Sequence, residues 1–170
     1  TRPSGSYSLE VTQLASSQTL VLGAFADNAD TVGEGTLSLR FGNIDGASFT
    51  ADTERTAVDI TLDATDTLES LAGKINAADS GITAYVANGT NGAQLVLKGE
   101  EGAANGFVIE TTSTSATPGA MPGDPTFLAW NPASDAGELR QVAQDAEFLL
   151  DTIAISNRSN DIRDSLPEGL

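Results

Sequence analysis

Apolar and polar residues alternate along several short segments of the chain. In residues 7–14, apolar side chains such as Leu9 and Val11 fall at every second position, the pattern of a strand with one buried face. Further strands are predicted at residues 19–25, 37–41, 58–62, 82–86, 95–97 and 107–109. Residues 138–145 predict either a helical turn or extended chain, and 148–155 either two strands or one bent strand.

One segment has a helical period instead. Its apolar residues are spaced for one face of a helix over about 67–79: Leu68, Leu71, Ala72, Ile75 and Ala78. Asp66, followed three positions later by Glu69, resembles a capping box, and Gly81 suits a left-handed C-terminal cap. Because Gly73 costs about 1 kcal/mol relative to Ala, packing must stabilise this helix.

The order of these elements predicts an α+β fold that is mostly antiparallel, with one helix packed on a small sheet. The turn at residues 88–92 joins two strands as a hairpin. If residues 7–14 pair with the strand near Phe148, the two ends of the chain form one lobe and the middle is inserted into it. We therefore expect two lobes, one of residues 1–34 with 113–170 and an inserted one of residues 35–112.

Residues 111–137 predict a long irregular connection, because four prolines interrupt any periodicity. This connection carries apolar side chains that are costly to leave in water: Met121, Phe127, Leu128 and Trp130. The favoured interpretation is that residues 127–130 dock onto a neighbouring lobe. The alternative is that these four residues form an exposed protein-contact loop.

Charge and composition exclude several classes of function. With 24 acidic and 8 basic residues, the net charge of −16 disfavours nucleic acid and anionic membranes as partners. The chain has no Cys and no His, which removes thiolate chemistry, Ser-His-Asp triads and the common zinc sites. We predict no catalytic, cofactor-binding or metal-binding residues, and no enzyme. The first residue is Thr1, which suggests an excised fragment.

Three local patterns resemble functional sites but have simpler interpretations. Residues 27–34 resemble a calcium loop, but Ala29 stands where an oxygen ligand is required, so a loop cap is favoured. The glycine-rich residues 99–106 lie between strands and predict a turn. Two carboxylates can hydrolyse a glycosidic bond without His, so a glycosidase stays as a third hypothesis; its conceivable partners are Glu100, Glu101, Asp145 and Glu147.

Several blocks carry a family resemblance. Residues 35–42, 67–78 and 81–86 resemble the flagellin hook IN motif, and residues 94–97 and 105–109 continue it. Residues 7–15, and residues 143–162 with Arg158-Ser159-Asn160-Asp161-Ile162, are similar to segments of the bacterial flagellar filament cap family, hook-associated protein 2. The long helical legs of that family are missing, so the resemblance covers the head region.

The resemblance implies a non-enzymatic, self-assembling protein at the tip of the bacterial flagellum, secreted through the flagellar export apparatus. Its implied partners are flagellin, which it helps to fold and polymerise, other copies of itself in a ring, and hook-associated proteins. In these terms residues 35–112 are an inserted hook IN-type domain within a head lobe. The alternative implied by the family is an adhesive head that binds host mucin or glycans.

Overall fold

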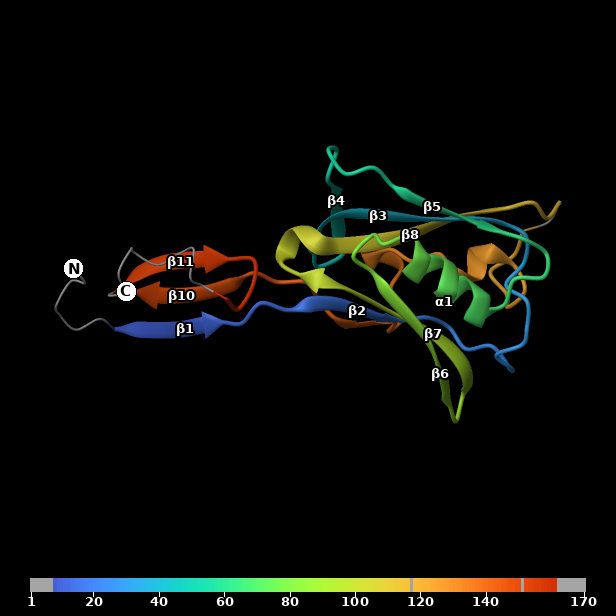
Figure 1. Ribbon diagram of the computed structural model, residues 1–170, viewed down its shortest axis with the longest axis horizontal. Helices are drawn as coiled ribbons and strands as arrows, with labels where there is room; N and C mark the ends of the chain where they lie inside the picture. Colours follow the sequence, from blue (N-terminus) through green and yellow to red (C-terminus); the bar gives the residue numbers. More distant parts are fainter. Residues whose placement is uncertain (1–7, 117, 151, 162–170) are drawn as a thin grey trace.

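Strand β3 (Gly35–Asp45) is the centre of one sheet in the computed structural model, which describes residues 8–116, 118–150 and 152–161 (Figure 1). On one side it pairs with β8 (Gly106–Ser113) from Gly35 to Gly42. On the other side it pairs with β5 (Val58–Leu62) and then β4 (Ser48–Ala51). All pairs are antiparallel, and the alternating apolar residues of β3 point into the core.

A second antiparallel sheet has the strand order β6-β7-β2-β9. The hairpin of β6 (Thr83–Gly89) and β7 (Gly92–Glu101) forms one side of it, as the turn at residues 88–92 predicts. Strand β2 (Ser17–Val21) pairs with β7, and β9 (Leu139–Gln141) pairs with β2. Segments from both ends of the chain therefore share one sheet with the central hairpin.

Helix α1 (Leu68–Ala77) is the single α-helix of the described residues, and it differs from the prediction at both ends. Its N-cap is Thr67, which forms a reciprocal capping box with Ser70, so the assignment of that role to Asp66 and Glu69 is wrong. The chain turns off the helix at Asp79, whose φ is 50°, two residues before the predicted Gly81. Asp79 can adopt this positive φ because short polar side chains tolerate the left-handed region of backbone conformation.

Side chains of α1 reach the open edges of both sheets. The amide of Asn76 accepts a hydrogen bond from the N–H of Ala84 in β6 and donates one to its C=O, both at 2.8 Å. Lys74 Nζ donates to the C=O of Thr61 in β5 at 2.9 Å. The buried face of the helix packs between these contacts, so α1 closes one side of the space between the sheets.

On the side opposite α1, the space between the two sheets is closed at the outer edge of β8. The buried side chain of Gln18 in β2 accepts from the N–H of Phe107 and donates to its C=O. Two residues further along, the backbone of Ile109 makes both hydrogen bonds to Trp130. One continuous apolar core fills the space between the two sheets, α1 and the loop that carries Leu128 and Trp130.

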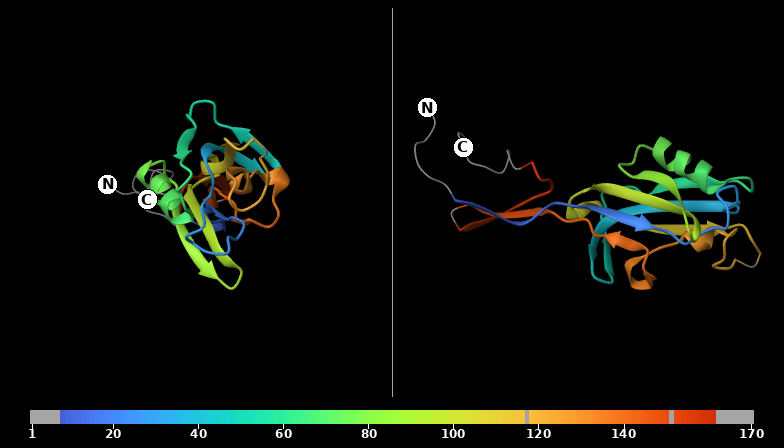
Figure 2. Two further views of the ribbon diagram at one scale, coloured as in Figure 1. Left: turned by 90° about the vertical axis from the view of Figure 1, so that its right-hand side faces the viewer. Right: turned by 90° about the horizontal axis from the view of Figure 1, so that it is seen from below.

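A third, three-stranded sheet lies apart at one end of the molecule (Figures 1 and 2). It consists of β1 (Leu9–Gln13), β10 (Ala146–Leu150) and β11 (Ile153–Asn157). Val11 pairs with Phe148, which confirms the predicted pairing of the two ends. The prediction of a buried face on the first strand is wrong, because β1 is an edge strand and Leu9 and Val11 are 49% and 54% exposed.

A short polar neck joins this sheet to the rest of the molecule. The backbones of Ser16 and Gln144 pair across it, and the side chain of Asn160 pairs with the N–H and C=O of Ala15. Asp145 accepts a hydrogen bond from the N–H of Ala103, the first residue of the short helix η1 (Ala103–Asn105). Both connecting segments are thus held to each other and to the body.

The α+β, mostly antiparallel fold class predicted from the sequence is confirmed. The segment predicted as two strands or one bent strand forms a strand pair, Ala146–Leu150 with Ile153–Asn157, and residues 139–141 are extended. The irregular connection contains two 3-10 helices, η2 (Pro125–Leu128) and η3 (Pro132–Ser134). Over the described part of the chain, no helix has the length and apolar character needed to cross a membrane.

Candidate protein-contact surfaces

The loop that the sequence offers as a protein contact is anchored by its own polar residues. Asp124 caps η2 by accepting from the N–H and Oγ1 of Thr126, and it also accepts from Ser113 Oγ at 3.0 Å. The hydrogen bonds from Thr126 lower the pKa of the Asp124 carboxyl. Asn131 caps η3 in the same way. These caps fix the direction in which the apolar residues of the loop point.

Most of those apolar residues point inward. Leu128 is fully buried and Trp130 is 2% exposed. Phe127 packs edge-on against Phe25, with ring centroids 5.4 Å apart, above Gly23, where a Cβ would lie 2.5 Å from the ring. The structure therefore places Leu128 and Trp130 in the core and packs the partly buried Phe127 against it, whereas Met121, at 69% exposure, is the member of the predicted contact loop that faces solvent.

Trp130 is held by both its backbone and its indole ring. The indole Nε1 donates to Asp135 Oδ1 at 3.1 Å, and the same carboxylate oxygen accepts from the N–H groups of Glu138 and Leu139. Partial desolvation raises the pKa of Asp135, but the hydrogen bonds from Trp130 and the backbone outweigh it and leave the pKa lowered. This contact ties the end of the loop to the start of β9.

The three-stranded sheet has apolar side chains that are exposed on its two edge strands. Leu9, Val11 and Ile153 are each about half exposed or more, and they lie opposite Leu150 and Phe148 of the central strand, which are buried. Residues directly opposite in neighbouring strands point to the same face of a sheet. The exposed side chains on the edge strands make this face a candidate contact surface, whereas the alternation of residues 7–14 predicted a buried face.

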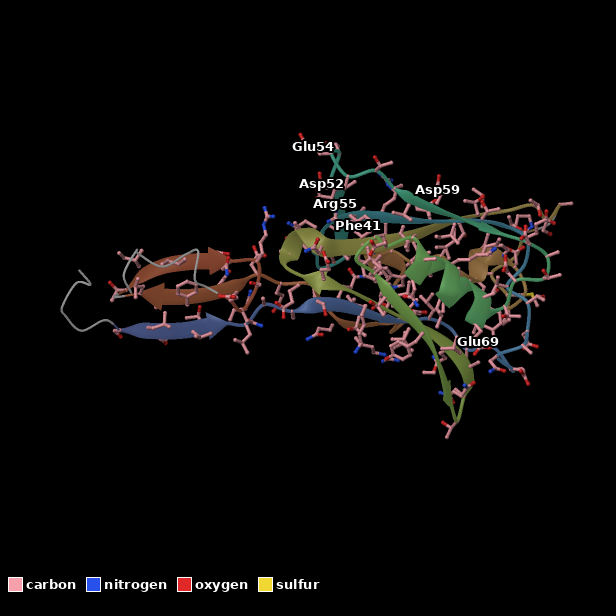
Figure 3. The ribbon with its side chains drawn as sticks, in the orientation of Figure 1. Phe41, Asp52, Glu54, Arg55, Asp59 and Glu69 are labelled. Atoms are coloured by element: carbon pink, nitrogen blue, oxygen red, sulfur yellow. The ribbon has the colours of Figure 1, made fainter. Side chains whose placement is uncertain are left out.

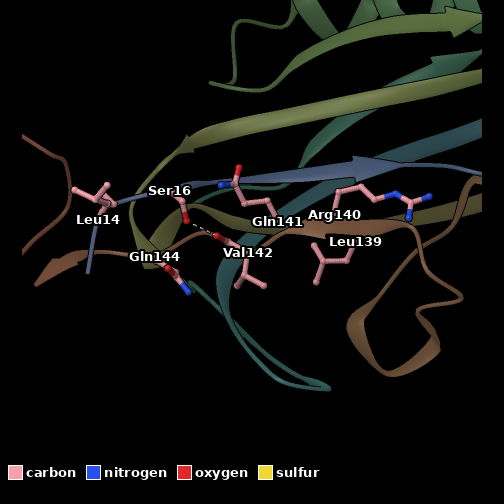
Figure 4. A pocket seen from close by; sticks show the side chains of 8 residues that line it. Leu14, Ser16, Leu139, Arg140, Gln141, Val142 and Gln144 are labelled. Atoms are coloured by element: carbon pink, nitrogen blue, oxygen red, sulfur yellow. Dashed lines mark hydrogen bonds between the residues drawn. The ribbon is translucent and has the colours of Figure 1, made fainter. Parts of the chain in front are cut away.

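An open pocket of about 590 Å³ lies at the neck. Figure 4 shows it between the segment from Leu14 to Ser16 and the strand that carries Leu139 and Arg140. Ser16 Oγ donates to the C=O of Val142 at 2.6 Å across its floor. Arg140 is the only ionisable side chain in the lining, so the pocket offers no acid–base pair for catalysis.

Three of the four carboxylates proposed for a glycosidase have contacts of their own within the fold. Asp145 accepts from Ala103 in the neck, and Glu101 accepts from Asn160. The side chain of Glu100 lies close to Gly81, so that a Cβ added to Gly81 would be 3.0 Å from Glu100 Cδ. None of the four lines the neck pocket or three further pockets of the described residues. These contacts disfavour a glycosidase.

Acidic side chains are spread over the body and gather at no metal site. Asp52, Glu54 and Asp59 lie along one rim and Glu69 lies on α1 (Figure 3). In the loop proposed as a calcium mimic, the carboxylates accept from backbone N–H groups of the loop itself, as the favoured cap interpretation predicts. Among the described residues, no group of three potential metal ligands comes together.

The comparisons with known proteins agree with this architecture. Residues 36–101, which run from β3 to the end of β7, match the family model of the flagellin hook IN motif. No curated protein sequence is significantly similar to the chain.

Several solved structures share its fold. The flagellar cap protein FliD D1-D2-D3 domains from Escherichia coli match with a TM-score of 0.74 and 24% identity, over 98% of this chain and 46% of that chain. FliD (HAP2) from Pseudomonas aeruginosa PAO1 matches with a TM-score of 0.71 and 23% identity, over 98% of this chain and 73% of that chain. The FliD D2-D3 domains from Serratia marcescens match with a TM-score of 0.71 and 24% identity, over 97% of this chain and 84% of that chain.

The resemblance found in the sequence is thereby confirmed for the motif and for the fold. The chain has the fold of the cap protein head over nearly its whole length and contains the flagellin hook IN motif. It spans about half the length of the Escherichia coli chain that it matches.

Proposed function

We propose that this chain is the head portion of a flagellar filament cap protein. The observation that carries the proposal is the coincidence of two findings in one chain. The fold follows the cap proteins over 98% of the chain, and residues 36–101 within that fold match a motif of flagellar proteins. The three-stranded sheet supports it as well, because it unites the two ends of the chain and leaves the middle inserted.

The proposed role is structural and non-enzymatic. Cap copies form a ring at the tip of the filament outside the cell, beside the hook-associated proteins, and the head helps arriving flagellin to fold and polymerise. The described surface fits such a role, because the edge strands of the three-stranded sheet offer exposed apolar side chains for a contact. The braced neck supports it too, since a contact surface guides a partner better when its orientation is fixed.

Residues 35–112 are part of this proposal as the inserted domain, with residues 1–34 and 113–170 as the outer lobe. Within that scheme β2 and β9 come from the outer lobe and extend the sheet of the inserted hairpin. The side chain of Gln18 also links the outer lobe to the inserted domain, because it bonds from β2 to Phe107 of β8. The two lobes then share a core and act as one rigid head.

An in-frame deletion tests the function. Residues 8–161 are removed from the protein in its own bacterium, and the culture medium is assayed for flagellin. Unpolymerised flagellin should appear in the medium and filaments should be lost, while Asn91→Ala, an exposed turn residue, should leave filaments intact. Detecting the shortened protein in the medium shows that it is still exported. Normal filaments on the deletion strain would refute the proposal.

Adhesion to host mucin or glycans is the alternative function. Sugar-binding sites use exposed aromatic rings as platforms, and Tyr85 is the one aromatic among the exposed large apolar residues of the described chain. Trp130 is buried in the core, and Phe127 is partly buried and packs against it, so neither ring is available as a platform. We therefore expect the isolated chain not to bind immobilised mucin, and saturable binding would favour adhesion instead.

A further inference from the structure

The hairpin of β6 and β7 projects from the body, and part of its outer edge is open (Figure 1). In an antiparallel pair, the backbone groups of successive residues point alternately toward the partner strand and away from it. Ala84 points away from β7, because its N–H and C=O are bonded to Asn76. The same alternation turns the N–H and C=O groups of Val86 and Asn88 outward.

The partner strand confirms this direction independently. Val86 lies opposite Leu95, and Asn88 lies opposite Ala93. The C=O of Leu95 accepts from Leu22, and Ala93 exchanges both hydrogen bonds with Phe25, so both residues of β7 face away from β6. Val86 and Asn88 therefore occupy non-hydrogen-bonded pairs, and no described residue bonds their outward backbone groups.

Parts of two other strand edges in the body of the fold are covered. Gln18 and Trp130 satisfy the outer edge of β8, and Lys74 reaches the C=O of Thr61 on β5. Asn76 covers β6 itself as far as Ala84. The helix then diverges from the hairpin (Figure 1), and the edge beyond Ala84 stays uncovered.

The open edge also lacks the protections that strand edges normally carry. Proteins block such edges with charged residues, prolines or bulges. Residues 81–97 contain no charged residue and no proline, in a chain whose net charge is −16, and β6 pairs with β7 in unbroken register. Tyr85 beside this edge is 45% exposed, and Tyr is enriched in protein interfaces.

We infer that the edge at Val86–Asn88 binds an extended segment of another polypeptide as an added β-strand. Main-chain hydrogen bonds supply the affinity in this mode of recognition. The edge is short, so binding is weak and transient, of about millimolar order. The inference rests on the proposed function only for the source of the segment, an incompletely folded flagellar subunit.

A second copy of the chain is a poorer occupant. Pairing β6 with β6 of another copy brings two strongly acidic molecules together, which repel each other. The contact is also limited to a few residues, well below the roughly 1,000 Å² that stable interfaces bury. An extended, non-acidic segment avoids this repulsion, because the hairpin that receives it is uncharged, and a transient contact does not need the area of a stable interface.

Amide-resolved NMR of the whole chain tests the inference. The probe is a synthetic peptide that copies residues 92–98, the strand that β6 already pairs with on its inner edge. At millimolar peptide, hydrogen exchange at the amides of Val86 and Asn88 should slow several-fold. Exchange at Ala87 should stay unchanged, because that residue faces β7. The control peptide is N-methylated at alternate residues and lacks the required donors.

Two variants block the edge from the side of the protein. Val86→Pro and Asn88→Pro each remove an outward N–H that β7 does not use. Each variant should abolish the slowed exchange, and the dispersion of the remaining amide signals reports whether the hairpin still folds. Two variants are used so that one misfolded hairpin does not decide the result.

Three outcomes would overturn the inference. They are unchanged exchange at Val86 and Asn88 up to several millimolar peptide, equal effects of the N-methylated peptide, and protection that rises with protein concentration without peptide. The last would assign the edge to a second copy. Loss of filaments on deletion together with unchanged exchange here refutes the edge alone, whereas normal filaments with edge binding refute the cap function alone.

Discussion

The side-chain amide of Gln18 takes the place of a neighbouring strand beside Phe107. It accepts from the backbone N–H at 2.8 Å and donates to the C=O at 2.9 Å, and the side chain is fully buried. Asn76 makes the same pair of bonds with Ala84, and Asn160 with Ala15. Amide side chains thus join elements that no strand ladder connects.

Replacing Gln18 with Leu should strongly destabilise the fold. The substitution leaves the N–H and C=O of Phe107 buried without partners, and each such group costs about 1–3 kcal/mol. We expect the free energy of unfolding to fall by about 2–5 kcal/mol, measured by urea denaturation.

Gln141→Leu is the matched control for that variant. Gln141 lies on β9 with an exposed side chain, so the same substitution should change stability by at most about 0.5 kcal/mol. Equal effects of the two variants would show that the Gln18 hydrogen bonds contribute nothing beyond surface polarity.

The sequence predicted the parts of the fold that depend on local patterns. Helix α1 and β5 follow from side-chain periodicity. Strand β4 was missed, because its four residues are exposed or half-buried and carry one large apolar side chain, Phe49. The N-cap was misplaced since Asp66 and Thr67 both fit the local signature.

The candidate surfaces were less predictable because they depend on contacts between distant residues. Gln18 and Phe107 are 89 positions apart, and Ala15 and Asn160 are 145 apart. Nothing local distinguishes Gln18 from an exposed glutamine. The open edge of β6 likewise depends on where α1 ends relative to the hairpin, although its lack of charge is visible in the sequence.

Asp66 should make stability depend on pH in the acidic range. Its carboxylate is 8% exposed and accepts from Lys74 Nζ, Ser70 Oγ and the N–H of Asp63. Burial raises the pKa of Asp66, but these hydrogen bonds outweigh it and the pKa is lowered. Stability from this group is therefore full above the unfolded-state pKa of about 3.9 and is lost as pH falls through the folded-state pKa.

Asp66→Asn should remove that part of the pH dependence, read as the urea midpoint between about pH 6 and pH 2.5. Lys74→Met removes the main partner, so the two substitutions should be non-additive in a double-mutant cycle at neutral pH. Strictly additive losses would contradict the coupling between the helix and this carboxylate.

Gly73→Ala should stabilise the protein. Gly73 lies inside α1, and a Cβ there meets no atom within 4 Å. Alanine should add about 0.5–1 kcal/mol and raise Tm by about 2–4 °C, measured by calorimetry.

The contrasting variant is Gly92→Ala at the hairpin turn. Its φ is 112°, and a Cβ would lie 2.1 Å from the C=O oxygen of Phe25. This variant should be destabilised. A gain in Tm for Gly92→Ala, or a loss for Gly73→Ala, would contradict the glycine roles assigned by the backbone.

Substitutions of Trp130 and Met121 test two roles of the irregular loop separately, its contribution to folding and its contact with another protein. Trp130→Ala removes a buried ring and its bond to Asp135, and should lower the free energy of unfolding by about 3–5 kcal/mol. Met121→Ala alters an exposed side chain and should leave stability unchanged. If the loop contacts another protein through Met121, Met121→Ala should reduce filament number in the bacterium while the purified chain melts normally. Normal filaments with Met121→Ala would exclude this residue as a contact, because folding is not affected and only the interface is tested.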